Sequence, residues 1–261
     1  MESVVDHSNV SVFRSSLHGY GVRSEQHFPQ GSVVLEERPH LFLQTIENKS
    51  NVLVCGNCAG FVGSKEASLQ LLERRISRQT ITASFFHDHT ADPDPCKYGQ
   101  IQPCDHFCGE LYCSLECKNV HWSQGHYLLC TGLVNEEEAS NHPLIRFKAH
   151  AVSTNEIFLL VADLFARIVA DVEGRSGIEN VPVELALQPL ESFVRNLWWD
   201  VAIEPIKKSS KLTPAKIIAK KKKFKDVLKK LVTDSWDLLS AALNLKTRGL
   251  DGVLTMEYMA R

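Results

Sequence analysis

Apolar residues change their spacing along the chain, from short β-prone runs near the N-terminus to helical repeats after residue 130. Three short apolar runs, at residues 10–13, 32–36 and 41–43, are separated by segments that contain glycine or proline. This pattern is typical of short strands joined by turns. We therefore expect a small β lobe of two or three strands within residues 1–54.

Helical periodicity is clearest in the C-terminal half. Apolar residues recur there at intervals of three and four, which places them on one face of a helix. A cap at residues 154–156 predicts the start of one such helix. The helices expected in this half cover residues 154–172, the segment after Pro189, residues 214–243 and residues 254–261. A shorter helix is expected earlier, within residues 64–82.

The same periodicity predicts which apolar side chains each helix carries toward a core. They are Leu69, Leu72 and Ile76 in 64–82; Ile157, Leu160, Val161, Leu164 and Ile168 in 154–172; Phe193, Leu197 and Trp198 after Pro189; and Ile217, Ile218, Leu228, Leu231 and Leu239 in 214–243.

Charge is concentrated in one segment. The chain has 29 basic and 31 acidic residues, for a formal net charge of −2. Residues 207–230 hold eleven lysines and one acidic residue, Asp226, so this segment carries +10 and the remainder −12. Its run Lys220–Lys223 has two interpretations: the solvated face of an amphipathic helix, or a patch for nuclear import or nucleic-acid contact. Phe224 is the one aromatic residue nearby, which does not favour sequence-specific RNA binding.

Cysteine and histidine are concentrated between residues 104 and 130. The segment CDHFCGELYCSLECKNVHWSQGHYLLC contains five cysteines and three histidines, and a Cys-x-x-Cys pair lies upstream. Thiolates and imidazoles at such short spacings are the ligands of tetrahedral zinc. The predicted ligands are Cys55, Cys58, Cys104, Cys108, Cys113, Cys117, His126 and Cys130, enough for two ions.

Disulfide bonding and cysteine catalysis account for these residues less well than zinc does. The chain begins without a signal-peptide pattern and has no apolar run of 18 residues, so we expect reduced ligands rather than disulfides, and no membrane span. A single catalytic cysteine would not explain seven others. Two ligand choices stay open. His121 follows Cys117 by four residues, as Cys130 follows His126, and Cys96 is an additional thiol in the segment between the two cysteine groups.

Eight protein ligands for two ions leave no coordination position for water or substrate. Zinc with four protein ligands is structural, and its binding stabilises segments that are too small to build a core. We therefore expect function in the surface that the zinc-binding segment shapes, or in the domain that it interrupts.

The residues Tyr112-Cys113, Cys117, His121-Trp122, His126 and Cys130 together resemble the end of a MYND zinc finger. The resemblance favours His126 over His121, because the residue directly before the tryptophan is not a ligand in MYND fingers. It also implies interleaved ions, one held by Cys55, Cys58, Cys113 and Cys117 and the other by Cys104, Cys108, His126 and Cys130. Two features depart from the pattern: residues 59–103 separate the first two pairs, and three residues rather than two separate Cys104 from Cys108.

The succession of β lobe, finger and helices resembles the SET and MYND domain protein-lysine methyltransferases, most closely the plant trithorax-related SET proteins. The fold implied is α+β: a split SET-type β lobe (1–54), a MYND finger with a long internal loop at 59–103 (55–130), and a helical insert (131–261). The cofactors implied are two structural zinc ions and S-adenosylmethionine. In that family an N-terminal Gly-x-Gly turn lines the S-adenosylmethionine site, which points here to His18, Gly19, Tyr20 and Gly21; on its own, Gly-x-Gly is typical of a hairpin turn.

The catalytic half of the family pattern is missing from these 261 residues. The family carries an Asn-His-x-Cys motif and, later, an active-site tyrosine. Here Asn141-His142 is followed by Pro143-Leu144, without the cysteine, and Tyr258 is the one tyrosine after Cys130. No catalytic residue is therefore assigned, and the chain resembles the front portion of such an enzyme.

Two functions follow from the resemblance. The first is a histone-type protein-lysine methyltransferase of which this chain is an incomplete, inactive or weakly active form. The second is a zinc-binding adaptor without catalysis, which contacts a protein or, through the basic stretch 207–230, DNA. Either function places the chain in the nucleus or the cytoplasm, away from membranes.

Overall fold

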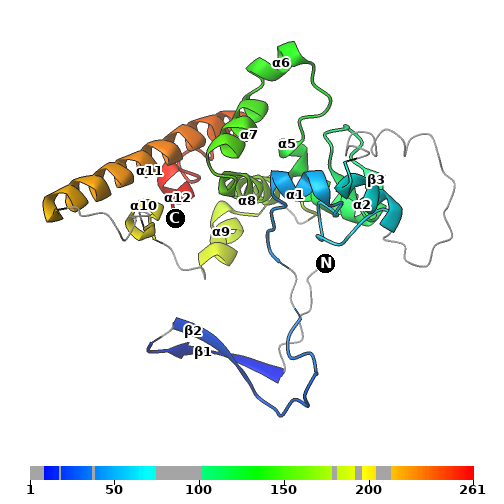
Figure 1. The fold of residues 1–261 in the computed structure, drawn as a ribbon, viewed down its shortest axis with the longest axis horizontal. Helices are drawn as coiled ribbons and strands as arrows, with labels where there is room; N and C mark the ends of the chain where they lie inside the picture. Colours follow the sequence, from blue (N-terminus) through cyan, green and yellow to red (C-terminus); the bar gives the residue numbers. More distant parts are fainter. Residues whose placement is uncertain are drawn as a thin grey trace. The chain divides into compact units, whose positions relative to one another are not determined.

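The computed structural model describes residues 9–17, 19–36, 39–74, 101–177, 181–191, 196–203 and 213–261, and the chain forms two compact units, Met1–Phe42 and Leu43–Arg261. Figure 1 draws both. The fold mixes helices with short strands, as expected. No described helix is both long and apolar enough to cross a bilayer. The predicted domain boundaries at residues 54 and 130 stay predictions.

The first unit contains a β-hairpin of two antiparallel strands, β1 (Val10–Ser15) and β2 (Gly19–Ser24). Phe13 lies opposite Gly21, and a Cβ built on Gly21 would lie 2.9 Å from the Phe13 ring. Glycine at this position therefore makes room for an aromatic ring on the neighbouring strand. The first predicted strand is confirmed, and it extends two residues further than expected.

The strands predicted at 32–36 and 41–43 are wrong, because neither run adopts strand structure. Strand residues need a neighbouring strand to pair their backbone groups, and no described strand pairs with either run. Val33 is 74% exposed. A short apolar run cannot by itself distinguish a strand from an irregular segment.

The second unit begins with a small segment rich in cysteine. Its elements are α1 (Ile46–Asn51), α2 (Lys65–Leu72), β3 (Gln102–Pro103), β4 (Leu111–Tyr112), α4 (Leu115–His121), the π-helical turn η2 (Trp122–His126) and α5 (Tyr127–Leu129). β3 and β4 pair antiparallel, and Val54 forms an isolated bridge with Phe61. The buried core of this segment is Leu53, Cys55, Val62, Leu71, Ile101, Cys104, Leu111 and Tyr112. Two of its eight residues are cysteines, so the side chains alone form only a small apolar core.

The helix predicted at 64–82 starts as expected, at an N-cap formed by the Ser64 side chain, and α2 ends at Leu72. Its predicted inward face is wrong. Leu71 is 2% exposed, whereas Leu69 and Leu72 are 48% and 55% exposed. Ile76 lies outside the described residues.

A helical block follows. It comprises α6 (Glu136–Asn141), α7 (Pro143–Thr154), α8 (Ile157–Val172), α9 (Val183–Glu191), α10 (Trp198–Val201), α11 (Pro214–Ala242) and α12 (Met256–Met259). α7, α8, α11 and the C-terminal turn enclose one apolar core, with Phe147, Phe165, Val232, Leu239 and Leu254 fully buried. Two polar contacts brace it: the His150 ring bonds the buried Ser235 hydroxyl, and the Trp236 indole donates to the Leu254 carbonyl.

The helix predicted at 214–243 is confirmed, and Pro214 stands at its first turn with Thr213 as the side-chain cap. Leu228 and Leu239 are buried as expected, but Ile218 is 69% exposed. The C-terminal helix is also present but spans only Met256–Met259.

Two other helix predictions need correction. α8 ends at Val172 as predicted but begins at Ile157, because Thr154 ends α7. Its buried face is Phe158, Ala162, Phe165, Ala166, Ile168, Val169 and Ala170. Of the predicted face only Ile168 is fully buried, and Ile157 is 46% exposed. The helix predicted to follow Pro189 instead contains it, because α9 spans Val183–Glu191. A separate short helix, α10, begins at Trp198, and Leu197 is its N-cap residue. Phe193 lies outside the described residues.

The cysteine-rich segment and the helical block are joined along η2, α5 and α8. Gln124 accepts a hydrogen bond from Arg167 of α8 at 3.2 Å, and the Tyr127 hydroxyl donates to Glu173 at 2.7 Å. The half-buried ammonium of Lys148, on α7, donates to the Leu129 carbonyl at 2.7 Å. These contacts fix the last turn of the cysteine segment against the helices.

Candidate metal centre

The structure brings all eight predicted ligands together in two groups of four. Cys55, Cys58, Cys113 and Cys117 form the first group, and Cys104, Cys108, His126 and Cys130 form the second. Within each group the ligand atoms all lie within 4.8 Å of one another. The groups interleave along the chain, in the arrangement that the resemblance implied.

The first group is held by a tight turn and by a helix N-terminus. The Cys55 N–H donates to the Gly60 carbonyl, and the Ala59 N–H donates to the Cys55 carbonyl. The resulting turn brings the side chains of Cys55 and Cys58 close together. Cys113 directly follows β4, and the backbone N–H of Cys117 is fixed by the Ser114 cap of α4 at 3.1 Å. Sγ of Cys113 lies 3.7 Å from Sγ of Cys58 and 3.5 Å from Sγ of Cys117.

The second group is held by the β3–β4 turn and by η2 and α5 at the helical end of the cysteine-rich segment. The Cys104 N–H bonds the Glu110 carbonyl across the turn, and Phe107 (φ 58°) and Gly109 (φ 93°) accommodate the three-residue spacing. Sγ of Cys104 lies 3.6 Å from Nε2 of His126 and 3.7 Å from Sγ of Cys130. Sγ of Cys108 lies 3.4 Å from the same Nε2.

These separations fit zinc. With Zn–S bonds of about 2.3 Å and Zn–N bonds of about 2.05 Å, tetrahedral geometry sets S···S edges near ~3.8 Å and S···N edges near ~3.6 Å. The S···S and S···N separations above lie within a few tenths of an ångström of these values. Seven thiolates and one imidazole are also the soft donors that select zinc over harder cations.

The cysteines of the second group share protons with one another, and this arrangement is compatible with a bound cation. Hydrogen bonds from the Cys108 and Cys130 thiols stabilise the Cys104 thiolate and hold its pKa far below the ordinary value. The pKa of Cys108 is raised, because this thiol keeps the proton that it shares with Cys104. Adjacent thiolates repel one another, so full ionisation of the group needs a positive charge at its centre, and metal binding releases the remaining protons.

His121, the alternative ligand, lies outside both groups. Its Nδ1 is hydrogen-bonded to the Tyr112 hydroxyl at 3.0 Å, and its ring stacks on His126 with centroids 4.7 Å apart. Burial lowers the pKa of His121 to about 3, so the ring is neutral and acts as packing and hydrogen-bond partner. Cys96, the other alternative, lies outside the described residues.

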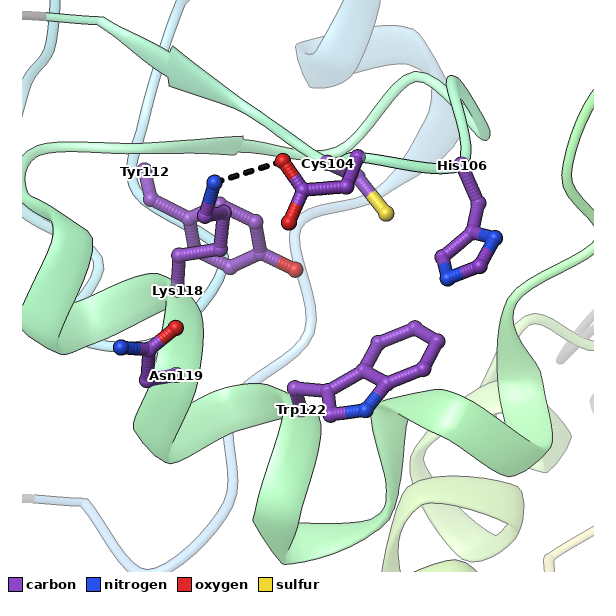
Figure 2. Close-up of a pocket in the computed structure, with 7 residues that line it drawn as sticks. Cys104, His106, Tyr112, Lys118, Asn119 and Trp122 are labelled. Carbon is purple, nitrogen blue, oxygen red and sulfur yellow. Dashed lines mark hydrogen bonds and ion pairs between the residues drawn. The ribbon is translucent and has the colours of Figure 1, made fainter.

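A hollow of about 180 Å³ lies beside the second group (Figure 2). It is lined by Cys104, Asp105, His106, Tyr112, Lys118, Asn119 and Trp122. His106 and Trp122 stack face to face with ring centroids 4.7 Å apart, and Lys118 donates to Asp105 at 2.7 Å. In Figure 2 the Cys104 sulfur points toward His106 and Trp122, so this aromatic pair covers one side of the second group.

Gly125 is a residue of the centre that the sequence reasoning missed. It has φ 122° inside η2, one residue before His126. A Cβ at this position would lie 2.7 Å from the Ala166 carbonyl carbon of α8. The one sequence signal was a glycine within an otherwise helical run, which lowers helix propensity without showing what it contacts.

The predicted S-adenosylmethionine residues belong to the other unit. Gly19, Tyr20 and Gly21 lie in β2, and His18 lies outside the described residues. Gly19 has φ 75° where β2 begins, and Tyr20 is 69% exposed. The hairpin geometry explains both glycines, so their role toward a cofactor stays a prediction.

The chain is similar to a plant histone-lysine methyltransferase. The relative is histone-lysine N-methyltransferase ATXR2 of Arabidopsis thaliana, 24% identical over 249 residues. The match covers 76% of this chain and 52% of that protein, so the chain spans about half the length of the relative. No family model and no solved structure matches the chain.

Proposed function

We propose that this chain is a zinc-stabilised portion of a SET- and MYND-type protein-lysine methyltransferase, with two structural zinc ions in the finger. The observation that carries the proposal is the pair of interleaved four-ligand groups. The similarity to a histone-lysine methyltransferase supports the choice of reaction. S-adenosylmethionine would supply the methyl group, a lysine of a histone or another protein would accept it, and the site of action would be the nucleus.

The zinc ions in this proposal do not take part in the reaction. Each group provides four protein donors, which completes a tetrahedral shell and leaves no position for water or substrate. Their contribution is to folding: the finger has only a small apolar core, and zinc binding is worth about 10–16 kcal/mol in small zinc peptides. Zinc held by His126 and Cys130 would in turn fix η2 and α5, the last elements of the finger, against α8.

Catalysis by these 261 residues alone is not expected. They contain neither an Asn-His-x-Cys motif nor a tyrosine in the place that the family pattern requires. Tyr258, the one candidate after Cys130, lies in α12 with its ring centroid 6.2 Å from that of Phe165 of the helical core. This observation favours a second candidate function for the chain by itself, a zinc-binding adaptor that holds a protein or DNA partner without transferring methyl groups.

S-adenosylmethionine binding separates the two functions. Calorimetric titration of the zinc-loaded chain is expected to detect no micromolar binding, since half of the predicted pocket is absent. Ultraviolet crosslinking with radiolabelled S-adenosylmethionine at millimolar concentration detects weaker contacts. It is expected to label the tryptic peptide 15–23, which holds the four predicted cofactor residues.

Two exposed side chains of β2 provide a matched pair for this experiment. Tyr20→Ala is expected to reduce the labelling several-fold, whereas Val22→Ala, 56% exposed on the same strand, should not. Micromolar affinity in calorimetry would contradict the incomplete pocket. Label outside residues 15–23, or equal loss in both variants, would refute the cofactor assignment of His18–Gly21.

A further inference from the structure

The two halves of α11 have different surroundings. From Leu228 onward the helix buries one side chain per turn, including Val232, Ser235 and Leu239. Between residues 214 and 227 no side chain is buried, and only Ile217 and Phe224 are half-buried. The N-terminal half is therefore a largely solvated helix, and in Figure 1 its end extends past α10, away from α7 and α8.

The lysines of α11 divide into two sets by their partners. Lys225 pairs with Asp200 at 2.9 Å, Lys229 lies 5.6 Å from the Trp199 ring centroid, and Lys230 pairs with Asp234 at 2.8 Å. These three lysines are engaged, two of them by α10. Lys216 and Lys221–Lys223 are exposed and form no ion pair within the part of the chain that the structure describes.

This arrangement is unfavourable for a helix that serves only as a solvated surface. Lys216, Lys220 and Lys223 follow one another at four and three residues, spacings at which like charges repel along a helix. The first turn of α11 has no acidic residue, and Lys216 lies in that turn, at the positive end of the helix dipole. A solvated face is usually stabilised by alternating acidic and basic residues, whereas here Asp226 is the only acid among residues 214–230. Such a departure from local helix rules is expected at functional sites.

We propose that the N-terminal half of α11, residues 214–227, binds the phosphate backbone of duplex DNA in the major groove. Bound phosphates neutralise the repulsion among the lysines and provide acidic partners for Lys216 and Lys221–Lys223, which form no ion pair among the described residues. This contact depends neither on the zinc ions nor on methyl transfer.

The shape and composition of the helix favour duplex DNA over other anionic partners. Fourteen residues of helix are about 21 Å long, and a helix fits the major groove of B-DNA, which is about 12 Å wide. The deep, narrow major groove of duplex RNA does not admit one. Single strands are bound by stacking on aromatic side chains, and Phe224, the one aromatic residue of this half, is half-buried.

A lipid surface fits less well. Ile218 and Val227 are the exposed large apolar residues of this half, at 69% and 53% exposed. They are nine residues apart, which places them on opposite sides of the helix, so the helix has no continuous apolar face to insert into a bilayer. Outside residues 207–230 the chain carries −12, so an anionic partner is attracted to the segment that contains this half of the helix.

Salt-dependent binding to a DNA duplex tests the proposal. The zinc-loaded full chain is titrated against a fluorescent 24-base-pair duplex by anisotropy between 50 and 200 mM salt. Replacing three lysines together, Lys216→Gln, Lys222→Gln and Lys223→Gln, is expected to reduce the slope of log K against log salt by about 2.7, since each phosphate contact contributes about 0.9. Glutamine has nearly the helix propensity of lysine, so α11 should persist by circular dichroism.

The matched control removes the same charge elsewhere: Lys65→Gln, Arg146→Gln and Lys246→Gln, all at exposed positions. This variant should leave the slope within about 0.5 of the unsubstituted chain. The proposal fails if the chain does not bind the duplex at 50 mM salt, or if both triple variants lose equal slope. It also fails if duplex RNA or anionic vesicles bind the helix as tightly as duplex DNA.

Discussion

Replacing His126 with alanine is expected to lower the zinc content of the purified chain from two equivalents to one. His126 provides the one nitrogen donor of the second group, and its Nε2 lies 3.4 and 3.6 Å from the sulfurs of Cys108 and Cys104. Three cysteines remain, but the fourth coordination position opens to water, and the turn of Gly125 and His126 is no longer held by a bond to the metal. Because structural zinc contributes about 10–16 kcal/mol in small peptides, the turn around the second group is expected to unfold locally while the first group and the helical block stay folded.

His121 provides the matched control for this prediction, since it is also buried and stacks on His126. His121→Ala should keep two zinc equivalents while it loses the stacking on His126 and the hydrogen bond to Tyr112, the latter at a cost of about 1–3 kcal/mol. Cys96→Ser should likewise retain both ions. If His121→Ala or Cys96→Ser loses an equivalent and His126→Ala does not, the ligand assignment is wrong. Inductively coupled plasma analysis with protein concentration gives the stoichiometry directly.

Gly125→Ala is expected to have the largest effect on stability of any glycine substitution in the finger. The new methyl group would lie 2.7 and 2.8 Å from the carbonyl carbon and oxygen of Ala166. These are backbone atoms of α8 and cannot rotate away, and φ 122° is strained for alanine. Overpacking and strain together cost about 2–5 kcal/mol, measured as a lower urea midpoint in the presence of zinc.

Two other glycines separate the causes of this loss. Gly249 has φ 70° and no neighbour within 4 Å of a built Cβ, so Gly249→Ala measures backbone strain alone, about 1–2 kcal/mol. Gly252 has neither a positive φ nor a close neighbour, so Gly252→Ala should change stability by less than about 1 kcal/mol. Equal urea midpoints for Gly125→Ala and Gly249→Ala would contradict the contact between η2 and α8.

The sequence predicts the metal groups better than it predicts the packing. Cys-x-x-Cys and the cysteine ladder after residue 104 are local patterns whose chemistry limits the possible partners, and the structure brings the predicted ligands together. Helix limits marked by caps were also predictable, as at Thr213 and Pro214 of α11.

Buried faces were less predictable, because periodicity becomes ambiguous where apolar residues are dense. α2 contains Leu69, Leu71 and Leu72, and only the neighbouring core of Leu53, Val62 and Ile101 selects Leu71. α8 is apolar around most of its circumference, so its face is set by α7 and by η2 on either side. The role of Gly125 could not be predicted either, because nothing in its local sequence shows that the backbone of α8 lies directly against it.

Two closed structural zinc sites are tested most directly by zinc-edge X-ray absorption on the unsubstituted full chain, combined with elemental analysis. Seven cysteines and one histidine shared by two ions predict two zinc equivalents, with an average shell of 3.5 sulfur and 0.5 nitrogen neighbours per ion. The bond lengths expected are about 2.3 Å to sulfur and about 2.05 Å to nitrogen. A single equivalent, or an oxygen neighbour in the first shell, would contradict two closed structural sites.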